Sequence, residues 1–319
     1  MKKDPTIASA VLIALLSLTF VNARCFPPRI GGDGNLSIVG RYNVDMAYGF
    51  DLKDEYAYLG TNRGLLILDI RDRTDPKRVA ELAWGFVKSV VVIDRIAYLC
   101  GGGNGLLIVD VSDVTHPRIL GSCLEGAEIY GFAKSGLYGF ACDRKEGMKI
   151  LDLQDPRHPK IIRAWTNGGG YWDIEIKDNI AYVADIRDGL ELIDLSDPAS
   201  PRLITTVPGT EGAVCVQLDG HHLCLGSDHG IKEYDVTQPL DPKLMMSALS
   251  DQEVLAGHLS NNLLLAGSDG IVAFDVANPD RLVRLARWTI RGGVHEILYD
   301  GEYVYTAKMG FYILKLKRS

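Results

Sequence analysis

The chain has 319 residues, of which 47% are hydrophobic, and a formal net charge of -7 at pH 7. This acidic balance, without any cluster of Lys and Arg, excludes a surface that binds the phosphate backbone of nucleic acids. Six cysteines are too few for a disulfide scaffold, and none forms the CxxC pairs of zinc or redox sites.

The first 23 residues have the features of a secretory signal peptide. Two lysines precede an apolar stretch over 7–21, which ends in VNA at 21–23, a sequence that suits signal peptidase. We therefore expect the mature chain to begin at Arg24 and to lie outside the cytoplasm, in a periplasm, at the cell surface or in the medium.

Two alternatives to a cleaved signal remain open. The apolar stretch could anchor the chain, although its roughly 15 residues fall short of the about 20 that a membrane-spanning helix needs. A lipid on Cys25 is the other alternative, but Arg24 stands where lipoprotein peptidase prefers a small residue. With the signal removed, residues 24–35 are an N-terminal extension, and no transmembrane span is expected.

A repeat of about 40 residues runs through the rest of the chain, from 36 to 319. Seven copies begin at glycines that lie 41, 42, 42, 41, 40 and 40 residues apart. They read GLLILD at 64–69, GLLIVD at 105–110, GMKILD at 147–152, GLELID at 189–194, GIKEYD at 230–235, GIVAFD at 270–275 and GFYILK at 310–315. So regular a period of strand-like elements predicts one all-β domain, a seven-bladed β-propeller.

Each repeat predicts a blade of four short antiparallel strands. The second repeat has an inner strand over 87–93, a turn at Asp94-Arg95 and a second strand over 96–100. The corresponding turns are Asp178-Asn179, Asp219-Gly220 and Asp300-Gly301, which are strong hairpin signals. The third strand is the segment that begins with glycine, and because it is apolar on both faces we expect neighbouring blades to cover it.

An Asp-rich turn follows the third strand, as in DLQDP at 152–156 and DLSDP at 194–198. Asp side chains cap their own backbone two residues on, and proline fixes the exit angle of the chain. Calcium is the alternative for spaced acidic residues, but its ligands must converge and these turns are spread around a ring. We therefore predict no metal site and no cofactor.

The two ends of the repeat region complement each other. The seventh copy stops after its third strand at 311–316, whereas LSIVGR at 36–41 resembles a fourth strand such as RLITT at 202–206. An open ring would leave an exposed sheet edge and an unfilled core seam. We therefore expect the N-terminal strand to complete the last blade.

These residues resemble the LVIVD repeat family of exported bacterial and archaeal proteins, whose name is close to LLIVD at 106–110. The resemblance is strong in the first four copies and weaker in the others, where Tyr234, Phe274 and Lys315 depart from the pattern. It implies a β-propeller at the cell surface or in the envelope. It implies no biochemical activity that could be assigned to particular residues.

One face of the propeller carries the residues suited to recognition. It is formed by the loops between blades and by the loops between second and third strands, and it mixes aromatic, charged and glycine residues. The candidate binding residues are Trp84, Phe86, Tyr130, Tyr171, Trp172 and His295. We expect a non-catalytic binding or scaffold module whose partner is a protein or a glycan, with a purely structural Asp-rich face opposite.

Alternation along the inner strands predicts the side chains that line the central channel. The polar set contains Asp51, Asp173 and Glu175, together with Ser89, Tyr130 and His295. A cation or polar ligand near the axis, or an enzyme with its site there, is the alternative function, and a water-filled tunnel is the simpler interpretation. No HExxH, GxSxG, P-loop or dinucleotide motif is present, so an enzyme is the less favoured alternative and a binding module is preferred.

Cys215 and Cys224 flank the turn at Asp219-Gly220. If those two residues form the whole turn, the cysteines lie directly opposite each other, with alpha carbons about 4.5 Å apart. A cross-strand disulfide is then expected in an oxidising compartment, and two buried thiols are the alternative.

Overall fold

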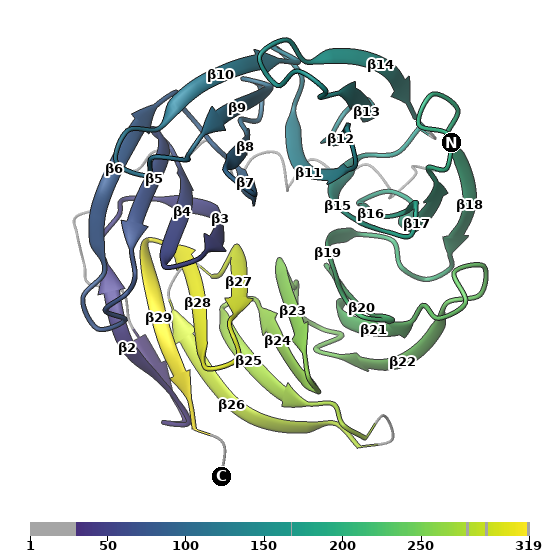
Figure 1. Cartoon of the computed structure of the whole chain (residues 1–319). Helices are drawn as coiled ribbons and strands as arrows, with labels where there is room; N and C mark the ends of the chain where they lie inside the picture. The colour runs from purple at the N-terminus through teal and green to yellow at the C-terminus, as the bar shows by residue number, and fades with distance from the viewer. Residues whose placement is uncertain (1–29, 167, 279–280, 291–292, 318–319) are drawn as a thin grey trace, which may run out of the picture.

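The computed structural model describes residues 30–166, 168–278, 281–290 and 293–317. These residues form seven antiparallel sheets arranged as a ring around a central axis (Figure 1). The all-β fold, a seven-bladed propeller of four-stranded blades, is thereby confirmed. The predicted signal peptide and Cys25 lie outside the described residues. Among the residues that the structure does describe, none lies in a helix long and apolar enough to cross a membrane.

The strands of each blade follow one another from the axis outward. Blade one contains β3 (Ala47–Lys53), β4 (Tyr56–Thr61), β5 (Gly64–Asp69) and β6 (Lys77–Ala83). Blade two contains β7 (Ser89–Ile93), β8 (Ile96–Cys100), β9 (Leu106–Asp110) and β10 (Arg118–Cys123). Blade three contains β11 (Ile129–Ser135), β12 (Tyr138–Asp143), β13 (Gly147–Asp152) and β14 (Lys160–Trp165), and blade four β15 (Tyr171–Lys177), β16 (Ile180–Asp185), β17 (Gly189–Asp194) and β18 (Arg202–Val207).

The remaining three blades follow the same order. Blade five contains β19 (Ala213–Asp219), β20 (His222–Ser227), β21 (Gly230–Asp235) and β22 (Lys243–Ala248). Blade six contains β23 (Ala256–Ser260), β24 (Leu263–Gly267), β25 (Gly270–Asp275), β26 (Val283–Ile290) and β1 (Ile30–Gly32). Blade seven contains β27 (Glu296–Tyr299), β28 (Tyr303–Lys308), β29 (Gly310–Leu316) and β2 (Leu36–Tyr42).

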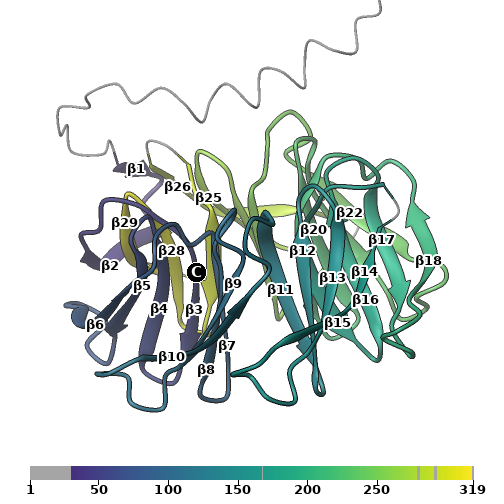
Figure 2. The same cartoon turned by 90° about the horizontal axis from the view of Figure 1, so that it is seen from above.

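The N-terminal strand closes the ring as expected. β2 pairs antiparallel with β29, from Leu36 opposite Leu316 to Tyr42 opposite Phe311, and supplies the outer strand of blade seven. Just before it, β1 pairs with β26 and gives blade six a fifth strand, which the sequence analysis did not predict. Both strands lie at the same side of the ring in Figure 2. The start of the described chain therefore fastens two neighbouring blades.

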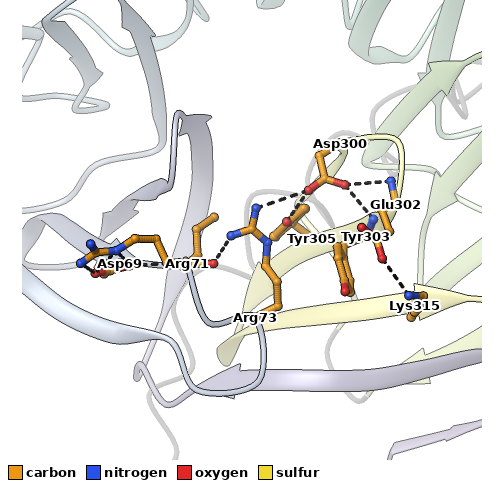
Figure 3. A network of polar contacts seen from close by, with 9 residues as sticks. Asp69, Arg71, Arg73, Asp300, Glu302, Tyr303, Tyr305 and Lys315 are labelled. Carbon is orange, nitrogen blue, oxygen red and sulfur yellow. Dashed lines mark hydrogen bonds and ion pairs between the residues drawn. The ribbon is translucent and has the colours of Figure 1, made fainter.

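A polar network joins blade one to blade seven at this closure (Figure 3). The Arg73 guanidinium, from the loop after β5, lies 3.7 Å from Asp300 and over the ring of Tyr305. The Tyr305 hydroxyl donates a 2.6 Å hydrogen bond to the Asp300 carboxylate. On β2, a Cβ added at Gly40 would lie 1.9 Å from the Arg73 carbonyl oxygen, so the closing strand and this loop are in backbone contact.

The hydrophobic core is a ring of clusters between neighbouring blades. The third strands are buried on both faces, as predicted: Leu106, Leu107, Ile108 and Val109 of β9 are each no more than 2% exposed. One cluster joins β5 of blade one to β28 and β29 of blade seven, so the core crosses the closure as well. Burial of this apolar surface supplies the main stabilisation of the ring.

The Asp residues that end the third strands cap the backbone that follows them. The Oδ1 atoms of Asp69, Asp110, Asp152 and Asp194 accept hydrogen bonds of 2.9–3.0 Å from the N–H two residues on. The predicted capping turns are thus confirmed, and these carboxylates already have backbone partners.

Two hairpin turns start one residue later than predicted. Asp219 pairs with His222, which leaves Gly220-His221 as the turn, and Gly220 has a φ of +62°. The N–H of Asp300 donates to the Tyr303 carbonyl, and Gly301 has a φ of +100°. The reason is that glycine takes a positive φ without steric strain, so it sits at the first position of the turn.

This shift moves the two predicted disulfide partners apart. Cys215 lies opposite Gly226, and Cys224 lies opposite Gln217. Both thiols are free in the structure, so the predicted disulfide is wrong. Its premise failed because the turn contains Gly220-His221 in place of Asp219-Gly220, which changes the partner of every residue on β19.

Candidate functional site

A cavity of about 370 Å³ lies at the axis, where the inner strands of the blades converge. Its polar wall residues include Asp51 of β3, Lys88 just before β7, Ser89 of β7, Lys134 of β11, Asp173 and Glu175 of β15, Gln217 of β19, His258 of β23 and Glu296 of β27. The volume is in the range of sites that take small molecules or the end of a larger ligand, roughly 300–1,000 Å³.

A β-bulge brings consecutive side chains of β15 into this cavity. Tyr171 pairs with Asp185 and Asp173 pairs with Ala184, so that Trp172 is the extra residue. Trp172 and Asp173 both line the cavity, whereas Tyr171 does not. The same irregularity occurs in β3, β11 and β19. A prediction that every second side chain of an inner strand faces the channel therefore omits part of the cavity wall.

Aromatic side chains gather at the end of the cavity where the chain enters each blade. We call Tyr48, Tyr130, Trp172 and His295 the aromatic rim. The rings of Tyr130 and Trp172 meet edge to face with centroids 5.1 Å apart, and those of Tyr48 and His295 are 6.0 Å apart. The Lys88 ammonium lies 5.9 Å from the centroid of the Tyr130 ring.

The predicted binding residues occupy three different environments. Tyr130, Trp172 and His295 line the cavity. Phe86 lies outside the cavity wall but packs edge to face on Tyr48, with centroids 4.7 Å apart. Trp84 packs against the core between blades one and two, over Gly101, where a Cβ would lie 2.4 Å from its ring.

Tyr171 is the binding prediction that the structure contradicts. Its side chain is 0% exposed and packs in the core between blades three and four. The Tyr171 hydroxyl donates a 2.6 Å hydrogen bond to Glu191, also buried. Tyr171 precedes the extra residue of the bulge and faces into the blade, so it cannot contact a partner at the surface.

Two of the predicted channel carboxylates hold neighbouring blades together. Asp51 accepts hydrogen bonds of 2.7 Å from the N–H of Leu52 and from the N–H of Val92 in the next blade. Asp173 accepts in the same way from Ile174 at 2.9 Å and from Val216 at 3.0 Å. Burial raises the pKa of both carboxyls, and these hydrogen bonds act against that rise.

The cavity combines two protonatable glutamates with the ammonium groups of Lys88 and Lys134. Burial, together with the negative charges of Asp173 and Asp51, raises the pKa of Glu175 to about 8 and that of Glu296 to about 8. Burial also lowers the pKa of Lys88, whose charge is favoured by Glu296 and Asp173. At neutral pH the two glutamates therefore mostly carry a proton and can donate hydrogen bonds.

Two ring nitrogens at the cavity are buried without a hydrogen-bond partner among the described residues. They are Trp172 Nε1 and His258 Nδ1. Burial lowers the pKa of His258 to about 4 and that of His295 to about 3, so both imidazoles are neutral at pH 7. Buried polar groups usually have a partner, so these two nitrogens are exceptions among the described residues.

Sequence reasoning missed Lys88 and Glu296 as cavity residues. Lys88 directly precedes β7 at the repeat position that Tyr48 holds in β3 and Trp172 holds in β15. Glu296 of β27 matches Asp173 of β15. Comparing equivalent positions of the repeats could have found them, whereas strand alternation alone could not.

Comparison with known proteins supports the repeat and the fold. Residues 46–81, 84–125 and 168–208 match the model of the LVIVD repeat. No curated protein sequence matches this chain. The β-propeller domain of Cps50 (Swd1) from Myceliophteria thermophila is similar, with a TM-score of 0.72 and 11% identity over 88% of this chain and 100% of that one.

A second solved structure is similar over the same share of the chain. The computationally designed Ika8 protein has a TM-score of 0.64 and 11% identity, covering 88% of this chain and 100% of its own. At this level of identity, both likenesses show the propeller fold alone.

Proposed function

We propose that this chain, a β-propeller that carries LVIVD repeats, is a non-catalytic binding module that acts outside the cytoplasm. The observation that carries the proposal is the aromatic rim above a polar cavity at one end of the ring. Rigid aromatic side chains around a concave site contribute much of the affinity at recognition surfaces. Export is inferred from the signal-like first 23 residues.

The chemistry of the cavity favours a partner with a hydroxyl-rich or amide-rich end. The rings of Tyr130 and Trp172 offer flat apolar surface, while Glu175 and Glu296 are protonated at neutral pH and can donate hydrogen bonds. The terminal sugar of a glycan uses both kinds of contact, as does a polar loop of a protein. We therefore propose a glycan or protein partner whose tip enters the cavity.

A metal cation at the axis, or an enzyme with its site there, is less well supported. Lys88 already places a positive charge among the channel carboxylates, close enough to Glu296 and Asp173 to affect its own pKa. A metal ion would have to compete with this ammonium. The carboxyls Asp51 and Asp173 are further occupied by backbone N–H groups of neighbouring blades.

Capture experiments test the proposal and separate the partner classes. The tagged chain is offered a glycan array and, in parallel, an envelope extract of its source, and retained material is identified. We expect a ligand that is retained and recovered chemically unchanged. Conversion of the ligand into a product would show an enzyme, and a failure of both arms to retain anything would contradict the binding function.

A further inference from the structure

Three carboxylates of blade four converge beside the loop between β16 and β17, outside the wall of the central cavity. Asp185 ends β16, Asp188 lies in the loop and Glu191 is on β17, and one carboxylate oxygen of each lies within 4.8 Å of the other two. Asp185 and Glu191 are 0% exposed, while Asp188 reaches solvent. Oxygens that bind one Ca²⁺ are at most about 5 Å apart, so this spacing suits a shared ion.

The Asp185 side chain has one oxygen that is occupied and one that is not. Its Oδ1 accepts hydrogen bonds from the N–H groups of Gly170, Arg187 and Asp188 at 3.0, 2.7 and 3.2 Å. Its Oδ2 is buried and has no partner among the residues that the structure describes. A Cβ on Gly169 would lie 1.4 Å from Oδ2, so only glycine leaves this oxygen its space. A buried carboxylate oxygen is costly unless a positive group faces it.

In blade three, a lysine ammonium occupies the position that is equivalent to the space between the three carboxylates of blade four. Asp143, Glu146 and Lys149 lie 42 residues before Asp185, Asp188 and Glu191. The buried ammonium of Lys149 lies 2.7 Å from a Glu146 oxygen and 3.9 Å from Asp143 Oδ2. In blade three the chain thus supplies its own cation. In blade four, Glu191 stands at the position of that lysine and adds a negative charge.

We propose that Asp185, Asp188 and Glu191 bind a divalent cation, with Ca²⁺ the ion best suited to three hard carboxylate ligands. The ion occupies the place that the Lys149 ammonium has in blade three. It stabilises the loop between β16 and β17 and, through the hydrogen bond from Tyr171 to Glu191, the seam between blades three and four. This structural site is independent of the binding site proposed above.

Terbium luminescence of the whole chain at pH 7 tests the site directly. Tyr171 donates to Glu191 and its ring stacks on Trp165 with centroids 6.2 Å apart, so both rings can sensitise an ion held by the three carboxylates. We expect Tb³⁺ luminescence that Ca²⁺ displaces. Saturating Ca²⁺ should also raise the melting temperature by roughly 5 °C, as expected for a ligand that binds only the folded state.

Matched variants locate the ion. Asp188→Asn should weaken Tb³⁺ binding by about tenfold or more, while Glu146→Gln at the equivalent position of blade three leaves it unchanged. Glu191→Lys, which installs the cation of blade three, should abolish the luminescence and make the melting temperature independent of Ca²⁺. Because Asp188 reaches solvent, we expect Asp188→Asn to fold. This variant therefore tests the site even if Glu191→Lys does not fold.

Three results would each overturn the proposal. The first is a parent chain without luminescence or a Ca²⁺ response. Equal weakening by Asp188→Asn and Glu146→Gln would show only diffuse binding to surface acids. A melting temperature that rises on acidification and ignores Ca²⁺ would show that a shared proton, and not a metal ion, neutralises the cluster.

Discussion

The carboxylate of Asp51 in blade one accepts a 2.7 Å hydrogen bond from the backbone N–H of Val92 in blade two. The same link joins Asp173 to Val216 at 3.0 Å and, through an amide oxygen, Gln217 to Leu259 at 2.8 Å. The innermost strand of a blade is an edge strand, so its backbone groups need partners from outside its own sheet. Side chains of the neighbouring blade provide these hydrogen-bond partners, so these channel residues stabilise the contact between blades.

Asp173→Ala should therefore destabilise the chain. The substitution leaves the N–H groups of Ile174 and Val216 without their acceptor, and each buried unsatisfied group costs about 1–3 kcal/mol. Asp173→Asn keeps one acceptor oxygen and should lose less. Urea unfolding measures both variants, and an alanine variant as stable as the parent would show that water replaces this link.

The protonated glutamates predict how stability depends on pH. The pKa of Glu175 and of Glu296 is about 8 in the folded chain against an ordinary value of 4.5, so the folded state binds protons that the unfolded state has lost. The neutral imidazoles His258 and His295 have the opposite effect, but only below their ordinary value of 6.5. Between about pH 6.5 and 8 the glutamates make stability fall as pH rises, while Lys88 and Lys308, whose pKa burial lowers, act in the opposite direction as they titrate.

Denaturant unfolding at pH 6.5, 7.5 and 8.5 checks this profile. The double variant Glu175→Gln/Glu296→Gln should remove the decline, because neither amide titrates. A parent chain whose stability changes with pH in the same way as that of the double variant would be inconsistent with buried, protonated glutamates.

The closure of the ring can be tested at a single glycine. A methyl group at Gly40 would lie 1.9 Å from the Arg73 carbonyl oxygen, so Gly40→Ala must push β2 away from the loop of blade one. We expect a loss of about 2 kcal/mol or more, within the range of overpacking substitutions. Gly103→Ala is the matched control, since a Cβ there meets nothing within 4 Å. Equal melting temperatures for the two variants would mean that this contact does not stabilise the closure.

The repeat made the global architecture predictable, because its period and its incomplete last copy determine the number of blades and the way the ring closes. Two local features could not be predicted from the sequence, for physical reasons. The bulge in β15 places Trp172 and Asp173 in the cavity together and turns Tyr171 into the core, which no two-residue alternation describes. Because Gly220 takes the first position of its turn, the turn starts one residue later than predicted, and Cys215 therefore pairs with a different residue.

The acidic cluster of blade four illustrates a different limit. Asp185 ends β16 and Asp188 lies in the loop that follows, but Glu191 lies on a strand between apolar neighbours. Only the pairing of β16 with β17 brings the three together. The comparison with blade three, where Lys149 holds the position of Glu191, shows that the blade-four cluster lacks a cation of its own. This comparison requires the repeats to be aligned residue by residue.

The central claim, that a partner binds at the aromatic rim, is tested most directly by the affinity of the captured ligand for two double variants on opposite faces. Tyr130→Ala/Trp172→Ala should weaken binding by about tenfold or more, as loss of aromatic hot spots does. Asp113→Ala/Asp155→Ala removes the acceptors of the Thr115 and Arg157 N–H groups and the carboxylate partners of His116 and His158. It should therefore lower the melting temperature and leave affinity unchanged. A folded aromatic variant that binds the ligand as tightly as the parent would contradict the account.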